Sequence, residues 1–329
     1  MLAFNSTLFK LLLPVQSNNH LFLTRPLTVF LLALKCCILW GSSFPAIKNG
    51  YLALGIGAGD IPSKMVFAGW RFAIAGVLLM IYASMSGRQF VSFERSTWRQ
   101  LFVLGLIQTT LQYIFFYIGV ANTTGVKSSI MNATGTFFSV IAAHYIYQND
   151  RLTFRKAFGC VLGFAGVLVV NLKADGFGIS EFTLLGEGFV VIAALVLALG
   201  SIYGKSVSQR LDPIVMTAWQ LIFGASVLLV IGYVMGGRIE KFTTTSFSLL
   251  IYLAVLSSLA ISIWSLLLKY NRVSVITTFN FLVPVFGALL SALFLSEKVL
   301  EWRNAAALFL VCAGILLVTY ARNASIKLE

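Results

Sequence analysis

Charge is scarce in this chain. Only 11% of the 329 residues are Asp, Glu, Lys or Arg, against about 25% in a soluble globular protein. Hydrophobic residues make up 59%, and apolar runs of about 20 residues, each long enough to cross a bilayer, recur along the whole sequence. The composition therefore excludes an ordinary soluble domain and predicts a helical protein embedded in the lipid bilayer.

Histidine, acidic residues and cysteine are also few, which bears on catalysis and metal binding. The chain has 2 histidines, 11 acidic residues and 4 cysteines, with no zinc-ligand spacing and no Walker sequence. The cysteines all lie inside apolar runs, where free thiols act as small hydrophobic side chains. An enzyme needs a nucleophile with a base, or a metal cluster. We therefore expect no catalytic activity, no cofactor and no metal.

Basic residues outnumber acidic ones by 24 to 11, a balance that can indicate nucleic-acid binding. The cations are scattered in short connections between apolar runs, however, and no nucleic-acid-binding motif accompanies them. In membrane proteins such cations favour the cytoplasmic side. With the N-terminus in the cytoplasm, the inner connections hold twice as many cations as the outer ones. We predict no nucleic-acid partner, and a multi-pass protein of a bacterial-type inner cell membrane with both termini in the cytoplasm.

Ten apolar segments lie between charged residues and Gly or Pro. They cover approximately residues 27–49, 64–85, 98–119, 124–146, 154–172, 184–206, 213–235, 247–268, 273–295 and 302–320. Residues 1–26 precede them as a cytoplasmic tail. The expected fold class is all-α, a polytopic membrane protein with ten transmembrane helices.

The two halves of the chain resemble each other. AGWRFAIAGVLLM (68–80) aligns with TAWQLIFGASVLL (217–229), which pairs Arg71 with Gln220. Each half holds five spans, an odd number, so the second half enters the membrane in the opposite sense. Such an inverted repeat is typical of many secondary transporters. We expect a first repeat over 27–172 and a second over 173–329, ending in a short cytoplasmic tail.

A second alignment pairs two acidic residues at helix ends. Residues 148–170 parallel 295–318, which pairs Asp150 with Glu297. Each acid would lie near the N-terminus of the next helix and beside an Arg or Lys, which is a structural role. A role in ion coupling is the alternative.

Glycine and proline interrupt the first span, in WGSSFP (40–45). Pro45 donates no backbone hydrogen bond, so the carbonyl of Gly41 loses its helical partner, and Pro284 does the same to Asn280 in the ninth span. Such breaks survive in lipid only where neighbours or water satisfy the freed groups. They fit a broken helix that bends at Gly41, Pro45 and Pro284 beside a pathway. They also fit close packing with a tolerated kink.

The motifs in this order resemble a known family. LWGSSFPAIKNG, followed by DIPSKMVFAGWRF, TTGVKSSIMNATGTFF and NDRLTFRKAFGCVLGFAGVLVVN, is similar to the EamA branch of the drug/metabolite transporter superfamily, and the likeness extends through both halves. It implies a ten-helix transporter with cytoplasmic termini that moves small metabolites, often outward. The family's first-helix Trp-Gly pair falls on Trp40-Gly41, and its second-helix Arg on Arg71. The chain departs from the family at Phe137, where a Pro often stands, so a symmetric hinge is not implied.

Three cations, Lys35, Arg71 and Lys127, lie inside predicted spans, where a charge is costly and marks a functional site. The guanidinium of Arg71 can clamp a carboxylate or phosphate bidentately, or bond backbone carbonyls. Lys127 and Lys35 lie nearer the span ends and can reach the interface instead. The corresponding positions of the second half are uncharged, which favours a ligand role.

Polar and aromatic side chains complete the predicted substrate cavity. They are Trp40, Gln108, Gln112, Asn132, Tyr203, Trp264 and Asn280, with Arg71 and Lys127. Gln108 and Gln112 are four residues apart and share one helix face, whereas aromatic residues inside spans also serve ordinary packing.

The sequence predicts a secondary transporter, an exporter or exchanger, of a small metabolite such as an amino acid or another carboxylate-bearing compound. A non-transporting scaffold, or a permease for a drug-like or nucleobase-type substrate, is the alternative. Small-residue seams serve both internal and intersubunit packing, so no oligomeric state is predicted.

Overall fold

The computed structural model describes residues 19–57, 59–89, 91–123, 125–170, 182–239, 243–294 and 302–326. Within these ranges all regular structure is helical, with no strand. The helices long and apolar enough to cross a membrane are Pro26–Leu54, Ile61–Met85, Arg95–Ala121, Leu184–Ser208, Pro213–Val234 and Thr244–Tyr270, six in the described part of the chain. Val273–Gly287 and Ala305–Thr319 are shorter apolar helices. The all-helical membrane class expected from composition is confirmed.

Helices lie within each apolar segment of the sequence. In chain order they are α2 (Asn19–Thr24), α3 (Pro26–Leu54), α4 (Ile61–Met85), α5 (Arg95–Gly105), η1 (Leu106–Leu111), α6 (Gln112–Ala121), α7 (Gly125–Ile146), η2 (Gln148–Asp150), α8 (Phe154–Val170), η3 (Leu184–Gly188), α9 (Phe189–Ser208), α10 (Pro213–Val234), α11 (Thr244–Tyr270), α12 (Val273–Thr278), η4 (Phe279–Phe281), α13 (Leu282–Phe294) and α14 (Trp302–Ile326). η1 and η3 are π-helical, and η2 and η4 are 3₁₀ turns.

Local sequence explains where several helices begin and end. Asp60 caps α4 by accepting a hydrogen bond from the backbone N–H of Ser63 at 3.0 Å, and Asp212 caps α10 in the same way. Both caps are followed by proline in the first turn, where a missing N–H costs nothing. α3 ends at Gly55, whose φ of 69° is the left-handed conformation that glycine adopts readily.

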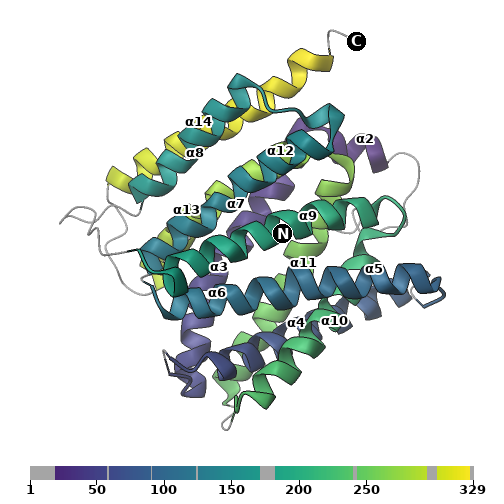
Figure 1. Cartoon of the computed structure of the whole chain (residues 1–329), viewed down its shortest axis with the longest axis vertical. Helices are drawn as coiled ribbons and strands as arrows, with labels where there is room; N and C mark the ends of the chain where they lie inside the picture. The colour runs from purple at the N-terminus through teal and green to yellow at the C-terminus, as the bar shows by residue number, and fades with distance from the viewer. Residues whose placement is uncertain are drawn as a thin grey trace, which may run out of the picture.

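The helices form two flanking pairs with a double layer between them (Figure 1). α8 packs along α14 at one end of the molecule, and α4 packs along α10 at the other. Between these pairs, α3 packs against α11 and α13 on one side. On the other side α9 packs against α6 and α7. The pairs α8–α14 and α4–α10 are therefore the outer flanks, and the other packed helices form the two layers between them.

Glycine allows the flanking helices to approach closely. A Cβ atom on Gly69 or Gly76 of α4 would lie 2.6 Å from side-chain carbons of Leu229 or Ile222 on α10. In the other flank, a Cβ on Gly159 would lie 2.7 Å from the carbonyl oxygen of Gly314. Small residues drive helix association in lipid by letting backbones meet. These seams are the close-packing role that glycine has inside membrane helices.

Candidate functional site

Arg71 lies in the middle of α4 and is only 4% exposed. Its Nε donates a hydrogen bond to Oγ of Ser257 on α11 at 2.7 Å, and its Cζ lies 5.0 Å from the ring centre of Phe72. The Ser257 hydroxyl in turn donates to the carbonyl of Leu253 at 2.7 Å. The serine therefore offers a lone pair to the arginine but no negative charge.

Three tyrosines interact with the charge of this guanidinium. Tyr113 and Tyr117 lie on α6 with ring centres 5.8 Å apart, and the Tyr113 ring lies 4.7 Å from that of Phe72. Tyr51 comes from the last turns of α3, and all three phenols are close enough to Arg71 to interact with its charge. Residues from three helices thus converge on the arginine. We call Arg71, Ser257, Tyr51, Tyr113 and Tyr117 the arginine–tyrosine cluster.

The electrostatics of this cluster favour an anion. Arg71 forms no ion pair with any carboxylate in the described part of the chain. A buried charge without a partner is expensive in a medium of low dielectric constant, and a bound anion relieves that cost. A guanidinium presents a planar fork that matches a carboxylate or phosphate. The arrangement can therefore hold an anionic group in the protein interior.

Other predicted site residues gather in a separate apolar cluster. Trp40 on α3 and Trp264 on α11 meet edge to face, with ring centres 4.9 Å apart. The residues next in sequence to Asn132 on α7, and those next to Asn280 in η4, belong to the same buried cluster. Both asparagines are partly buried. The structure thus brings the two tryptophans together, but it places Arg71 with a different cluster of buried residues.

The two predicted glutamines lie at a π-helical segment that the sequence did not indicate. Gln108 lies within η1 and donates to Oγ of Ser201 on α9 at 3.3 Å, while Gln112 begins α6 and is buried. Segments of this kind are frequent at functional sites. Gly224 of α10 lies close to this segment, because a Cβ added at Gly224 would lie 2.4 Å from the Cβ of Thr109. That Gln108 and Gln112 share one side of a substrate cavity stays a prediction.

The remaining candidates fall elsewhere. Tyr203 packs with Trp98, Leu104 and Met216 in a small cluster at one end of the bundle, away from the arginine–tyrosine cluster. Lys35 is half-buried on α3. The side chain of Lys127 lies outside the described residues, as does Glu297, so their predicted roles stay predictions.

The interruptions in the first and ninth spans have different outcomes. α3 is one continuous helix from Pro26 to Leu54, with Pro45 inside it. Ser43 Oγ bonds the carbonyl of Trp40 at 2.6 Å, one turn before the proline. The ninth span does change geometry, because the 3₁₀ turn η4 precedes the helix that contains Pro284.

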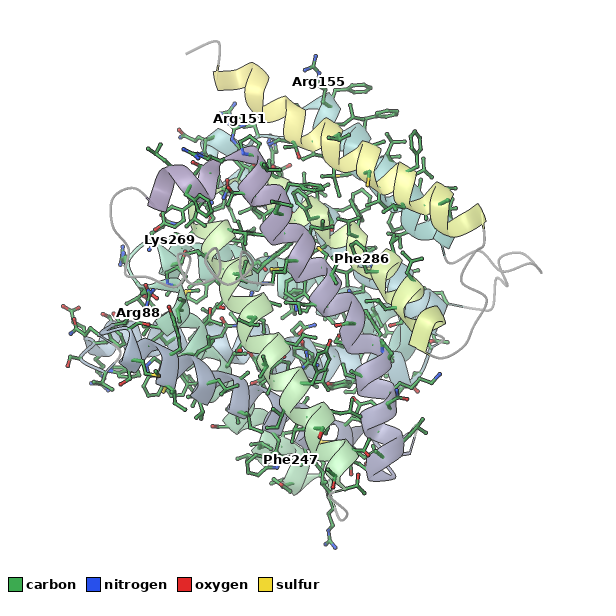
Figure 2. All side chains as sticks on the ribbon, turned by 180° about the vertical axis from the view of Figure 1, so that it is seen from behind. Arg88, Arg151, Arg155, Phe247, Lys269 and Phe286 are labelled. Atoms are coloured by element: carbon green, nitrogen blue, oxygen red, sulfur yellow. The ribbon has the colours of Figure 1, made fainter. Side chains whose placement is uncertain are left out.

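Gly41 has the close-packing role that the sequence suggested. A Cβ at this position would lie 2.6 Å from the Cβ of Phe286 and 3.0 Å from the backbone nitrogen of Gly287, both on α13. Figure 2 shows Phe286 between α3 and α13. Only glycine lets α3 and α13 meet in this way. Whether the helices bend at Gly41, Pro45 and Pro284 stays a prediction.

Asp150 has the expected cation beside it but caps a helix that the sequence did not indicate. Its side chain is 1% exposed and forms an ion pair with Lys156 at 2.6 Å. The expected cation is therefore present. The helix N-terminus that it caps is not that of the next helix, α8, but that of α12 in the other half, through the backbone N–H of Ser274 at 2.9 Å.

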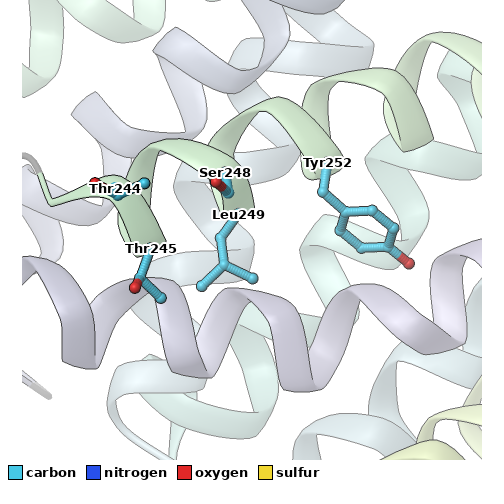
Figure 3. Close-up of a pocket in the computed structure, with 5 residues that line it drawn as sticks. All are labelled: Thr244, Thr245, Ser248, Leu249 and Tyr252. Carbon is cyan, nitrogen blue, oxygen red and sulfur yellow. The ribbon is translucent and has the colours of Figure 1, made fainter.

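An open groove of about 480 Å³ lies at the start of α11 (Figure 3). It is lined by Thr244, Thr245, Ser248, Leu249 and Tyr252. The Tyr252 hydroxyl is 2.7 Å from the hydroxyl of Ser42 on α3. At Tyr252 the groove therefore borders the glycine–serine motif of the first span. None of the predicted substrate-binding residues lines this groove.

Comparisons with known proteins agree with the family resemblance. The EamA-like transporter family matches residues 27–172 and 184–320. The uncharacterized transporter YvbV of Bacillus subtilis is 30% identical, over 90% of this chain and 92% of its own. A probable amino-acid metabolite efflux pump of Escherichia coli is 27% identical, over 81% of this chain and 87% of its own. One crystal structure, 15% identical, superposes with a TM-score of 0.75 over 90% of this chain and 98% of its own, which supports the fold alone.

Proposed function

Because the chain belongs to the EamA-like transporter family and is a metabolite transporter, we propose a substrate class for it. The proposed substrate is a small carboxylate-bearing compound, such as an amino acid, whose anionic group binds Arg71. The observation that carries the proposal is a guanidinium 4% exposed whose hydrogen-bond partner, Ser257, is neutral. The relative in Escherichia coli named for amino-acid metabolites supports the same substrate class.

The proposed scaffold is ten transmembrane helices in two inverted repeats, 27–172 and 173–329. Helix packing supports this division. Under the sequence alignment α3 corresponds to α9, α5–α6 to α11, and α7 to α12–α13. The packing of α3 on α11 and α13 then mirrors that of α9 on α6 and α7, while α4–α10 and α8–α14 each map onto themselves. The two separate segments matched by the family support the same division.

The proposed orientation has both termini in the cytoplasm of a cell membrane. Arg88, Arg151, Arg155 and Lys269 follow one edge of the molecule, whereas Phe247 lies toward the opposite edge (Figure 2). Basic residues in short connections favour the cytoplasmic side. A reporter fused to the C-terminus should therefore be active only when it functions in the cytoplasm. Activity of an exclusively periplasmic reporter there would contradict the orientation.

Transport by the purified protein in lipid vesicles tests the substrate class. The panel is L-leucine, L-phenylalanine, succinate and benzoate, each with its primary amide, and a permanent cation, tetraphenylphosphonium. We expect saturable flux of at least one carboxylate and much slower flux of its amide, because only the carboxylate compensates Arg71. Preferred transport of tetraphenylphosphonium, or equal flux of acid and amide, would reject an anionic substrate.

A mode of coupling is suggested by the acidic residues that the apolar segments lack. No Asp or Glu lies in the middle of any apolar segment of the sequence, and such carboxylates are common proton carriers in transporters. We therefore propose exchange or facilitated flow rather than a proton relay through a carboxylate in mid-membrane. Vesicles preloaded with unlabelled carboxylate should then take up labelled carboxylate faster than empty vesicles do, and an imposed pH gradient alone should give little accumulation.

A further inference from the structure

The hydroxyl of Tyr51 is buried and forms no hydrogen bond of normal geometry with the described residues. A buried tyrosine hydroxyl usually finds a partner. Its ring is nevertheless held firmly, edge to face with Phe67 at 5.6 Å between ring centres and with Lys64 Nζ 5.5 Å from its own centre. The phenol is therefore fixed in position, and its hydroxyl, which interacts only with that of Tyr117 among the described residues, keeps spare hydrogen-bonding capacity.

Tyr117 faces Tyr51 from another helix. It lies on α6, is 7% exposed, and its hydroxyl interacts with that of Tyr51. Its ring packs between those of Tyr113 and Phe116, at 5.8 and 6.0 Å between centres. Two phenol groups from α3 and α6 thus approach each other beside the guanidinium, and neither is carried by α4 itself.

The guanidinium has donors to spare at the same place. Nε of Arg71 is the nitrogen that bonds Ser257. Its two terminal nitrogens, Nη1 and Nη2, have no hydrogen-bond partner in the described part of the chain and form no ion pair there. A carboxylate has two oxygens with about four lone-pair sites. The fork can bond both oxygens, which leaves further lone pairs for two hydroxyl donors.

We propose that the hydroxyls of Tyr51 and Tyr117 join Arg71 in one receptor for the substrate's carboxylate, which makes these two tyrosines specificity-determining residues. The inference rests on the proposed function, because it needs an anionic substrate at Arg71. A primary amide presents an NH₂ group where a carboxylate presents an acceptor, so it leaves one hydroxyl and part of the fork unpaired. Sites built from buried polar groups reject such analogues strongly.

Tyrosine-to-phenylalanine variants test the proposal, because they remove the hydroxyl and keep the ring that packs on Phe67 or Tyr113. Tyr51→Phe, Tyr117→Phe and the double variant are compared with wild type in lipid vesicles, with L-leucine, L-phenylalanine, succinate and benzoate and their amides. Each single variant should raise KM for the transported carboxylate about tenfold with little change in kcat. It should also lower the preference for acid over amide. Because both hydroxyls bind one carboxylate, the double variant should raise KM by less than the product of the two single-variant fold increases.

Tyr145→Phe is the matched control, because Tyr145 is 81% exposed at the end of α7. It should leave KM and the acid-to-amide preference unchanged. If folded Tyr51→Phe and Tyr117→Phe proteins also keep both values, the tyrosine receptor is wrong. Loss of flux by the same factor for acid and amide would likewise contradict it, since that pattern indicates a structural role.

Arg71→Lys separates this inference from the proposed function. If Arg71→Lys weakens carboxylate transport while the tyrosine variants do not, the anion site stands and the tyrosine receptor fails. If Arg71→Lys has no effect either, the proposed function itself fails. A second readout needs no substitution: with 3-fluorotyrosine at all 11 tyrosines, fluorine signals of buried rings should shift with the transported carboxylate and not with its amide. An unchanged spectrum would contradict the proposal.

Discussion

Asp150 and Ser274 lie 124 residues apart in the sequence and are joined by a hydrogen bond of 2.9 Å, from the backbone N–H of Ser274 to Oδ2 of Asp150. The Ser274 hydroxyl donates to the other carboxylate oxygen, which also accepts from Nζ of Lys156. A carboxylate near a helix N-terminus is stabilised by the helix dipole. One side chain therefore ties the connection between α7 and α8 to the start of α12 in the other half.

Replacing Asp150 with Asn should strongly destabilise the protein. Lys156 would be left as a buried cation without its carboxylate, and breaking one partner of a buried ion pair typically costs about 3–5 kcal/mol. The measurement is the midpoint of thermal unfolding in detergent. Asp212→Asn is the control, since Asp212 pairs with Arg88 at a more exposed place, 22% exposed, and asparagine keeps the cap of α10. A drop for Asp150→Asn no larger than for the control would contradict this reading.

Arg71 variants should show how the guanidinium is used. Arg71→Lys keeps the charge but loses the planar fork, and should weaken carboxylate binding by about 1–3 kcal/mol, the scale of a charge-assisted hydrogen bond. Arg71→Gln, which copies the corresponding residue of the second half, should be worse. Substrate affinity in lipid vesicles is the measurement. Arg151→Lys, at an exposed position at the edge of the molecule, should leave the affinity unchanged.

Gly41→Ala should impair the protein through packing alone. The new methyl group would meet the Cβ of Phe286 at 2.6 Å, too short for any rotamer change to relieve. α3 and α13 must therefore separate, and we expect a lower unfolding temperature together with slower transport. Gly57→Ala is the matched control, because nothing lies within 4 Å of a Cβ there. Wild-type behaviour of Gly41→Ala would show that α3 and α13 can separate without cost.

Pro45→Ala tests the hinge, and its expected signature is kinetic. Alanine restores the N–H that can bond the carbonyl of Gly41, which stiffens a helix that is already continuous in this structure. We expect kcat to fall while KM for the carboxylate changes little. Binding and turnover are measured on the same vesicles. Unchanged kcat would leave Pro45 as a residue of packing only.

Much of the helical arrangement follows from sequence because one physical signal dominates it. Apolar runs of bilayer length place the helices within a few residues, since lipid leaves the backbone no other way to satisfy its hydrogen bonds. The buried position of Arg71 follows from its place inside such a run. Gly41 as a point of close approach follows from the small-residue pattern.

What the sequence could not predict depends on contacts between distant segments. The π-helical turn at Leu106–Leu111 contains Thr109, which lies close to Gly224 of α10, and neither residue signals this locally. The partner of Asp150 lies in the opposite half. Tyr51 and Tyr117 looked like any aromatic residue near a span end. They become candidates only when three helices bring them to one guanidinium.

The pairing of α4 with α10 has a consequence for how the chain is made. On a ribosome, α4 enters the membrane long before α10 exists, so its glycine ridge at Gly69 and Gly76 has no helix to receive it. The same holds for α8, whose partner α14 is made much later. A nascent first half must therefore wait in the bilayer with two open seams.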